Sequence, residues 1–258
     1  MSFCSMSDTR NIKLLIAYDG TDFCGWQRQD TVLNESHRTV QGVIERALEE
    51  MHKRPVQLNG CGRTDSGVHA IGQVANFSTD MHSVPSNRFA PALNNLLPFD
   101  VRVLSSSEAP SEFHARFDAA MRTYRYHFIC GRFMLPHESR YNYHVRHYPR
   151  LDRLNAYCRL LLGETDCSVF AAAGDKSKSR FRYISRASFF IESSRLIFEI
   201  SANAFLWKMV RSVAGTFLLC DEEDMPPETL REIIASGDRS RAGPTLPPQG
   251  LFLWKVEY

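Results

Sequence analysis

The sequence lacks the long apolar runs and paired cysteines that would place it at once in a special class of protein. Its 258 residues contain no stretch of about 18 uninterrupted apolar residues, so we expect no transmembrane helix. Residues 1–10 have no apolar core segment, which argues against a signal peptide. The seven cysteines form no C-x-x-C pair, and an odd, unclustered set is typical of a reducing compartment rather than of a disulfide framework or a zinc site. We therefore expect a cytoplasmic protein.

The composition is that of an ordinary globular chain. Hydrophobic residues make up 43% and charged residues 23%, which excludes a disordered, collagenous or coiled-coil protein. The length allows one large domain or two modest ones. The formal net charge of only +2 argues against a strongly nucleic-acid-binding protein, but an average can conceal a divided surface.

The charge is in fact divided along the chain. Residues 111–150 carry seven arginines against three acids, with nine aromatic residues among them, and residues 176–182 form a second basic run of Lys176, Lys178, Arg180 and Arg182. Acids gather instead at residues 221–232. Arginine interleaved with aromatics suits single-stranded or looped RNA, although the same alternation marks strands with one buried and one solvated face. The two basic runs together favour RNA and predict one positive cleft, formed with Arg116, Arg122 and Arg125, and an acidic periphery.

Hydrophobic periodicity predicts two α/β halves, a domain of residues 1–110 and a domain of residues 111–258, joined near residues 106–112. In the first half we expect strands at 13–18, 56–59, 73–77 and 101–104, with helices at 39–52 and 86–95. In the second half we expect strands at 123–129, 181–191, 196–201 and 251–258, with helices at 151–162, 204–220 and 227–236.

The segment that best suits chemistry is Gly60-Cys-Gly-Arg-Thr-Asp-Ser-Gly-Val-His-Ala70, between two predicted strands. Glycines at this density let a backbone turn sharply or approach a ligand. If Arg63 lies close to Asp65, it lowers the pKa of that carboxyl by about 1–3 units and keeps it ionised. The alternative is an Asx-type turn in which Asp65 caps local amides and Arg63 is solvated. Phosphate-loop, dinucleotide and zincin motifs are absent, and His144-x-x-His147 lacks a matching metal-ligand partner, so no metal is expected.

Gly62-Arg-Thr-Asp-Ser-Gly-Val-His-Ala70 closely resembles the catalytic signature of the TruA family of tRNA pseudouridine synthases. The likeness continues, in order, over nearly the whole chain. The further segments that carry it are Tyr18-Asp-Gly-Thr-Asp-Phe-Cys-Gly-Trp-Gln-Arg-Gln29, Arg38-Thr-Val-Gln-Gly42, Gly72-Gln-Val-Ala-Asn-Phe77, Phe113-His-Ala-Arg116, Arg122-Thr-Tyr-Arg-Tyr126, Asn203-Ala-Phe-Leu-Trp-Lys-Met-Val-Arg211, Gly215-Thr216, Ala242-Gly-Pro-Thr245, Gly250-Leu251 and Val256-Glu-Tyr258.

The resemblance implies an isomerase that converts uridine to pseudouridine in the anticodon stem-loop of tRNA, at positions 38, 39 and 40 of the tRNA. Asp65 matches the essential aspartate, whose carboxylate either attacks the sugar C1′ or removes a proton from C2′. Tyr124 matches the tyrosine expected to stack on the target uracil, Arg211 the basic residue expected to pair with Asp65, and Arg63 the arginine that helps to position the extruded nucleotide. Neither role of Asp65 needs a metal or a cofactor.

The fold that the resemblance implies is α+β: two RRM-like (ferredoxin-like) halves whose antiparallel sheets join into one extended sheet with a central cleft. The expected partners are tRNA and a second copy of the chain in a homodimer, with no membrane. The chain departs from the family's usual pattern at Ser66, at Trp207-Lys208 and at the acidic segment of residues 221–224.

Two other functions stand beside this one. A non-catalytic RNA-binding module would fit the arginine and aromatic runs, but its discriminating feature would be the loss of Asp65 or Tyr124, and both are present. A hydrolase using Asp65 and His69 would need a metal-ligand set or a nucleophile that the sequence does not supply.

Overall fold

The computed structural model describes residues 9–28 and 37–258, and Cys4 and Gln29 of the sequence argument lie outside them. The chain divides into two compact units. We call the part up to Ala119, together with Tyr258, the N-terminal unit, and Ala120–Glu257 the C-terminal unit. Within the described ranges, no helix has the length and apolar character needed to cross a bilayer.

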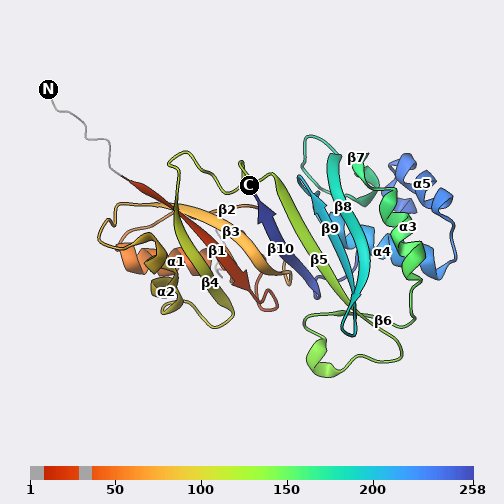
Figure 1. Ribbon diagram of the computed structural model, residues 1–258, viewed down its shortest axis with the longest axis horizontal. Coiled ribbons are helices and arrows are strands. Elements are labelled where there is room, and N and C mark those ends of the chain that lie inside the picture. The colour runs from red at the N-terminus through yellow and green to blue at the C-terminus, as the bar shows by residue number, and fades with distance from the viewer. Residues whose placement is uncertain (1–8, 29–36) are drawn as a thin grey trace. The chain divides into compact units, whose positions relative to one another are not determined.

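The N-terminal unit is a sheet with two helices (Figure 1). Its strands run in the order β4-β1-β3, all antiparallel, and the short β2 pairs with β3. The elements are β1 (Arg10–Tyr18), α1 (Val40–His52), β2 (Asn59–Gly60), β3 (His69–Thr79), the 3-10 turn η1 (Ser86–Arg88), α2 (Phe89–Asn94) and β4 (Val101–Ala109).

Side chains on one face of this sheet pack against the helices. Ile12 of β1 is opposite Phe77 of β3, and both are fully buried. Phe77 meets Phe89 of α2 edge-on, with ring centroids 5.5 Å apart. Thr39 accepts a hydrogen bond from the Gly42 N–H and so caps the start of α1, as expected for a threonine before an apolar helical stripe. The predicted strand 13–18 and helix 39–52 are confirmed.

The serine-rich stretch predicted to connect the halves is partly strand. Strand β4 continues through residues 105–109, where Ser106 lies opposite Leu14 and Ser107 opposite Lys13 of β1. Pairing with β1 therefore overrides the turn-like composition of this stretch. The strand predicted at 56–59 is reduced to the two residues of β2, and the helix predicted at 86–95 begins as a 3-10 turn.

The C-terminal unit has a larger sheet, in the order β10-β5-β9-β8-β7, with antiparallel neighbours; β6 adds to β5 in parallel. Its elements are β5 (Met121–Cys130), η2 (Pro136–Glu138), β6 (Tyr143–Val145), α3 (Leu151–Arg159), β7 (Gly163–Asp166), η3 (Ser168–Phe170), β8 (Phe181–Glu192), β9 (Arg195–Ala202), α4 (Met209–Glu222), α5 (Pro227–Ser236), η4 (Arg239–Arg241) and β10 (Leu251–Glu257). The predicted α+β class is confirmed.

An aromatic core joins this sheet to its helices. Phe198 of β9 stacks on Phe189 of β8 at 4.6 Å, and Phe217 of α4 lies against both rings. Tyr157 of α3 reaches the same phenylalanine at 5.7 Å. These contacts hold α3 and α4 against the sheet (Figure 1).

The long helix begins later than its apolar pattern predicts. Residues 204–208 were expected to be helical, but α4 starts at Met209. Lys208, immediately before it, has a left-handed backbone with φ of 60°. That conformation interrupts the right-handed helix, so residues 204–208 form an irregular segment ahead of α4.

Candidate active site

The loop of residues 60–70 connects β2 to β3 and is held by the segment that follows β1. The Trp26 N–H donates to the Thr64 carbonyl at 3.1 Å, and the Gly67 N–H donates to the Phe23 carbonyl at 3.3 Å. Backbone hydrogen bonds of this kind fix a loop without relying on side chains. Two segments that carry the family resemblance, residues 18–28 and 62–70, are therefore bonded to each other within the N-terminal unit.

Two glycines permit the close approach of these segments. A Cβ added at Gly20 would lie 2.0 Å from the carbonyl oxygen of Val68, a distance that requires the backbone to move. Gly25 has φ of +94°, and a Cβ there would lie 2.6 Å from the carbonyl oxygen of Thr64. Only glycine fits both positions without strain.

A buried polar network lies beneath the loop. The hydroxyls of Tyr18 and Thr64 are hydrogen-bonded at 2.8 Å. Gln73 is fully buried, donates to the Gly62 carbonyl at 3.1 Å and accepts from the Cys61 thiol at 2.8 Å. Burial raises the pKa of Tyr18 well above its usual value, so its hydroxyl stays protonated. Strands β1 and β3 thus anchor residues 61, 62 and 64, on both sides of Arg63 and next to Asp65.

Asp65 itself is half-buried at the turn of this loop. Its carbonyl accepts the Val68 N–H at 3.1 Å, and Gly67 within the turn has φ of +77°. Arg63 is exposed and donates to Gln27 at 3.4 Å. The Arg63 side chain thus lies toward solvent and Gln27, as the alternative with a solvated arginine expects.

His69 has a structural environment at the start of β3. It is 1% exposed, and its Nδ1 accepts the Gly20 N–H at 3.0 Å and lies 3.1 Å from a carboxylate oxygen of Asp19. His69 thus helps to hold the segment after β1 against the loop. The burial of His69 is therefore explained by these structural contacts, without the catalytic role that the hydrolase alternative would give it.

Tyr124 is on β5 in the C-terminal unit. Its half-buried ring meets Phe205 edge-on, with centroids 5.0 Å apart and an interplanar angle of 84°. Alternation along the strand directs Tyr124 and Tyr126 to the same face. Tyr126 is fully buried, and its hydroxyl donates to the Pro247 carbonyl. The contact with Phe205 therefore packs the Tyr124 ring against the segment that precedes α4.

Arg211 lies in the first turn of α4 and is held by the segment of residues 242–246. Its Nε donates to the Leu246 carbonyl at 2.6 Å, and its own carbonyl accepts the Leu246 N–H at 3.3 Å. The helix and the segment touch backbone to backbone, since a Cβ at Gly215 would lie 1.9 Å from the carbonyl oxygen of Pro244. Two further parts of the family resemblance are thus joined, and they orient the guanidinium.

Several arginines of the basic runs are paired with carboxylates within the fold. Arg125 pairs with the buried Glu199 at 2.7 Å, and Arg180 pairs with Asp175 at 2.7 Å. Other pairs connect the acidic segment at 221–224 to the end of the first basic run, where Arg150 contacts Asp221 and Asp224 and Arg153 also contacts Asp224. Sequence counting did not find these pairs, because the partners lie 5 to 74 residues apart along the chain.

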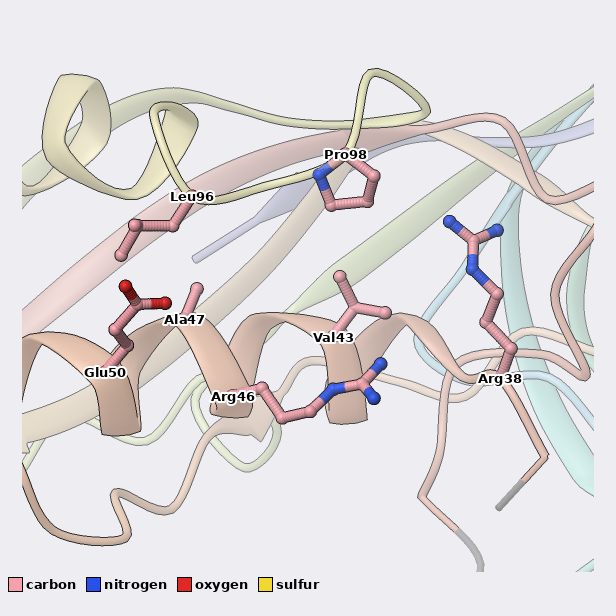
Figure 2. Close-up of a pocket in the computed structure, with 7 residues that line it drawn as sticks. All are labelled: Arg38, Val43, Arg46, Ala47, Glu50, Leu96 and Pro98. Atoms are coloured by element: carbon pink, nitrogen blue, oxygen red, sulfur yellow. The ribbon is translucent and has the colours of Figure 1, made fainter. Parts of the chain in front are cut away.

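Other candidate features lie away from these residues. A pocket lies between α1 and residues 96–98, with Glu50 at the end opposite Arg38 (Figure 2). Arg38 is engaged by both carboxylate oxygens of Asp100, at 2.8 and 2.9 Å. The pocket contains none of Arg63, Asp65, Tyr124 and Arg211, and no set of three or more metal-ligating side chains occurs within residues 9–28 and 37–258.

Comparison with protein families gives one match that spans most of the chain. A family model described as tRNA pseudouridine synthase matches residues 14–118 and 157–258. These ranges include the loop at 60–70, Arg211 and the segment at 242–246.

Curated relatives match over nearly their full length. A tRNA pseudouridine synthase A of Treponema denticola is 53% identical over 249 residues, which are 96% of this chain and 93% of the relative. One of Treponema pallidum (strain Nichols) is 47% identical, covering 93% of this chain and 85% of the relative. One of Brachyspira hyodysenteriae is 39% identical, covering 94% of this chain and 96% of the relative.

Proposed function

The chain belongs to the tRNA pseudouridine synthase family, and on that premise we propose that it isomerises uridine in the anticodon stem-loop of tRNA with Asp65 as its catalytic residue. The family match and relatives that share up to 53% of its residues support an isomerase and a tRNA pseudouridine synthase. The role of Asp65 is supported by the loop at 60–70, whose sequence matches the family's signature and whose backbone is held on both sides of Asp65.

The reaction breaks the N1–C1′ glycosidic bond, rotates the uracil and joins C5 to C1′. C5 loses its proton as it bonds to C1′, and N1 gains a proton in place of its bond to C1′. The Asp65 carboxylate serves this sequence either by attacking C1′ or by removing a proton from C2′, and either step needs an ionised carboxylate held at the ribose. A fixed loop favours both, because a poorly placed catalytic group loses much of its effect over about 1 Å.

The remaining roles follow the motif match. We propose that the Tyr124 ring stacks on the target uracil. The edge-on contact with Phe205 would keep the Tyr124 ring in one orientation. Arg211 is proposed to hold Asp65 charged, with its guanidinium oriented by the Leu246 carbonyl. Arg63 is proposed to position the extruded nucleotide, and its exposed side chain with one long hydrogen bond can reorient toward RNA. Extruding a paired base costs a few kcal/mol, so such contacts have a physical task.

We propose a cytoplasmic homodimer that binds one tRNA, with two domains at 1–110 and 111–258, no metal and no cofactor. The family resemblance supports the dimer and the tRNA, and the match of the named relatives over 93% or more of this chain supports carrying those properties across.

Release of tritium from 5-tritiated uridine in unmodified tRNA tests the function. We expect the wild-type protein to release tritium, and Asp65→Ala and the near-isosteric Asp65→Asn to release none while still binding tRNA. Activity that survived in both variants would refute the assignment of Asp65. Binding of tRNA by the wild-type protein without any release would refute the isomerase and indicate an RNA-binding module instead.

A further inference from the structure

A buried carboxylate ties a basic loop to the irregular segment before α4. The side chain of Asp175 is 3% exposed, and its two oxygens accept the Trp207 N–H at 2.5 Å and the Ser177 N–H at 2.8 Å. Burial alone would raise the pKa of Asp175, but these two amides and the Arg180 guanidinium lower it below its usual value. The Trp207 carbonyl accepts the Ala172 N–H at 3.1 Å, so the loop is bonded to Trp207 on both sides of the residue.

This scaffold presents an aromatic ring and three cations. The Trp207 side chain remains 46% exposed, and the Lys208 Nζ lies 4.6 Å from its ring centroid. Gly174, with φ of +84°, is next to the indole. Lys176 and Lys178 are exposed on the same loop, and within residues 9–28 and 37–258 none of the three lysines has an ion-pair partner.

A second cation and indole pair in the same unit shows what an internally satisfied arrangement looks like. The Arg125 guanidinium lies 4.1 Å from the Trp254 ring centroid, but it also pairs with Glu199 at 2.7 Å and is only 18% exposed. Its charge is used within the protein. At Trp207 the neighbouring carboxylate is instead occupied by backbone amides and Arg180, which leaves the lysine charges uncompensated.

We propose that Trp207, Lys208, Lys176 and Lys178 form a contact surface for an unpaired nucleotide of RNA, with the base stacked on the indole and the phosphates on the lysines. An exposed flat ring beside uncompensated cations is the combination that unstacked bases and their phosphates require. None of these four residues is among those proposed for chemistry. That the RNA is tRNA rests on the proposed function.

Intrinsic fluorescence provides a direct test, because the three tryptophans differ in environment. Trp26 is 3% exposed and Trp254 is half-buried, so Trp207 is the most accessible to a base. Titration with an unmodified tRNA transcript is expected to quench the wild-type emission, and Trp207→Phe is expected to abolish most of that quenching. Trp207→Ala is expected to weaken tRNA binding by about 5- to 150-fold, the range measured for losing one stacked base.

The lysines are tested by salt dependence with a matched control. Lys176→Ala/Lys178→Ala is expected to weaken tRNA binding and to reduce the slope of log K against log salt by about 1.4, at about 0.7 for each phosphate contact with a single strand. Lys255→Ala, which removes an exposed lysine already paired with Glu257, is expected to leave the slope unchanged.

The outcomes separate this proposal from the proposed function. If Trp207→Ala has the same turnover and the same tRNA affinity as the wild type, the contact surface is overturned and the proposed isomerase activity is unaffected. Quenching that depends on Trp207 in a protein without turnover would support the surface and refute the isomerase. If tRNA does not quench the wild-type emission, the proposed contact surface is overturned. Thermal unfolding of each variant shows whether it is folded. If Trp207→Ala does not fold, Trp207→Phe and Lys176→Ala/Lys178→Ala still test the proposal.

Discussion

Replacement of Tyr18 by Phe tests whether the buried network beneath the loop positions Asp65. The change keeps the ring and removes only the hydroxyl that contacts Thr64 at 2.8 Å. Thr64 is 7% exposed, so its hydroxyl would lose a partner away from water, which costs about 1–3 kcal/mol of folding free energy. In a chain of this size the melting temperature should fall by about 2–4 °C for each kcal/mol.

The more informative effect is on turnover. Thr64 precedes Asp65 directly, so a loosened Thr64 displaces the carboxylate, and a displacement of about 1 Å costs about a hundredfold in rate. We expect kcat for tritium release to fall between tenfold and a hundredfold, with little change in KM for tRNA. A fall in stability alone would leave the kcat of the folded enzyme unaffected.

A double-mutant cycle with Thr64→Val isolates the pair. If the two hydroxyls act only through each other, Tyr18→Phe/Thr64→Val should be no slower than the slower single variant. Tyr148→Phe, which removes the hydroxyl of an 80% exposed tyrosine, is the matched control and should leave kcat unchanged. Fully additive losses, or an unchanged kcat in Tyr18→Phe, would refute the positioning role.

Two further predictions concern packing and charge. Gly20→Ala places a Cβ 2.0 Å from the Val68 carbonyl oxygen, so calorimetry should show a loss of about 1–3 kcal/mol and the tritium assay a lower kcat; a wild-type melting temperature would contradict the close approach. The Arg150 and Arg153 guanidinium groups hold the pKa of Asp224 below its usual 3.8. A lowered carboxyl pKa stabilises the fold above the unfolded value and loses that effect as pH falls through the folded value. The wild type should therefore melt higher than Asp224→Asn at pH 7, and the gap should close below about pH 3.8; a gap independent of pH would contradict it.

Periodicity predicted the elements whose patterns are local. Strand β1 and helix α1 follow their own alternation and apolar stripe, and Thr39 begins the helix as its side chain predicts. The apolar pattern did not predict the late start of α4, where Lys208 has a left-handed backbone and the Trp207 N–H is bonded to Asp175, 32 residues away along the chain. The extension of β4 through its serines has the same kind of cause, since β1 supplies the partners.

In the candidate site too, the sequence identified individual residues but not the contacts that distant segments make with them. The motif identified Asp65, Arg63, Tyr124 and Arg211 as residues of interest, and their roles stay proposals. The spacing of Arg63 and Asp65 left open both an ion pair and a solvated arginine, because two residues along an irregular loop need not face each other, and the structure has Arg63 exposed and bonded to Gln27. The supports beneath the loop were not identified from sequence, since a glutamine such as Gln73 in an apolar strand gives no sign of what it will bond.

The crossing of Gly215 and residues 242–246 has a consequence for building hybrid enzymes. A Cβ at Gly243 would lie 2.7 Å from the Gly215 carbonyl oxygen, and the Thr216 hydroxyl accepts the Gly243 N–H at 3.0 Å. The helix and this distant stretch are therefore one interchangeable part, although about 20 residues separate them. A chimera that exchanges α4 with a relative keeps the orientation of Arg211 only if residues 242–246 are exchanged along with it.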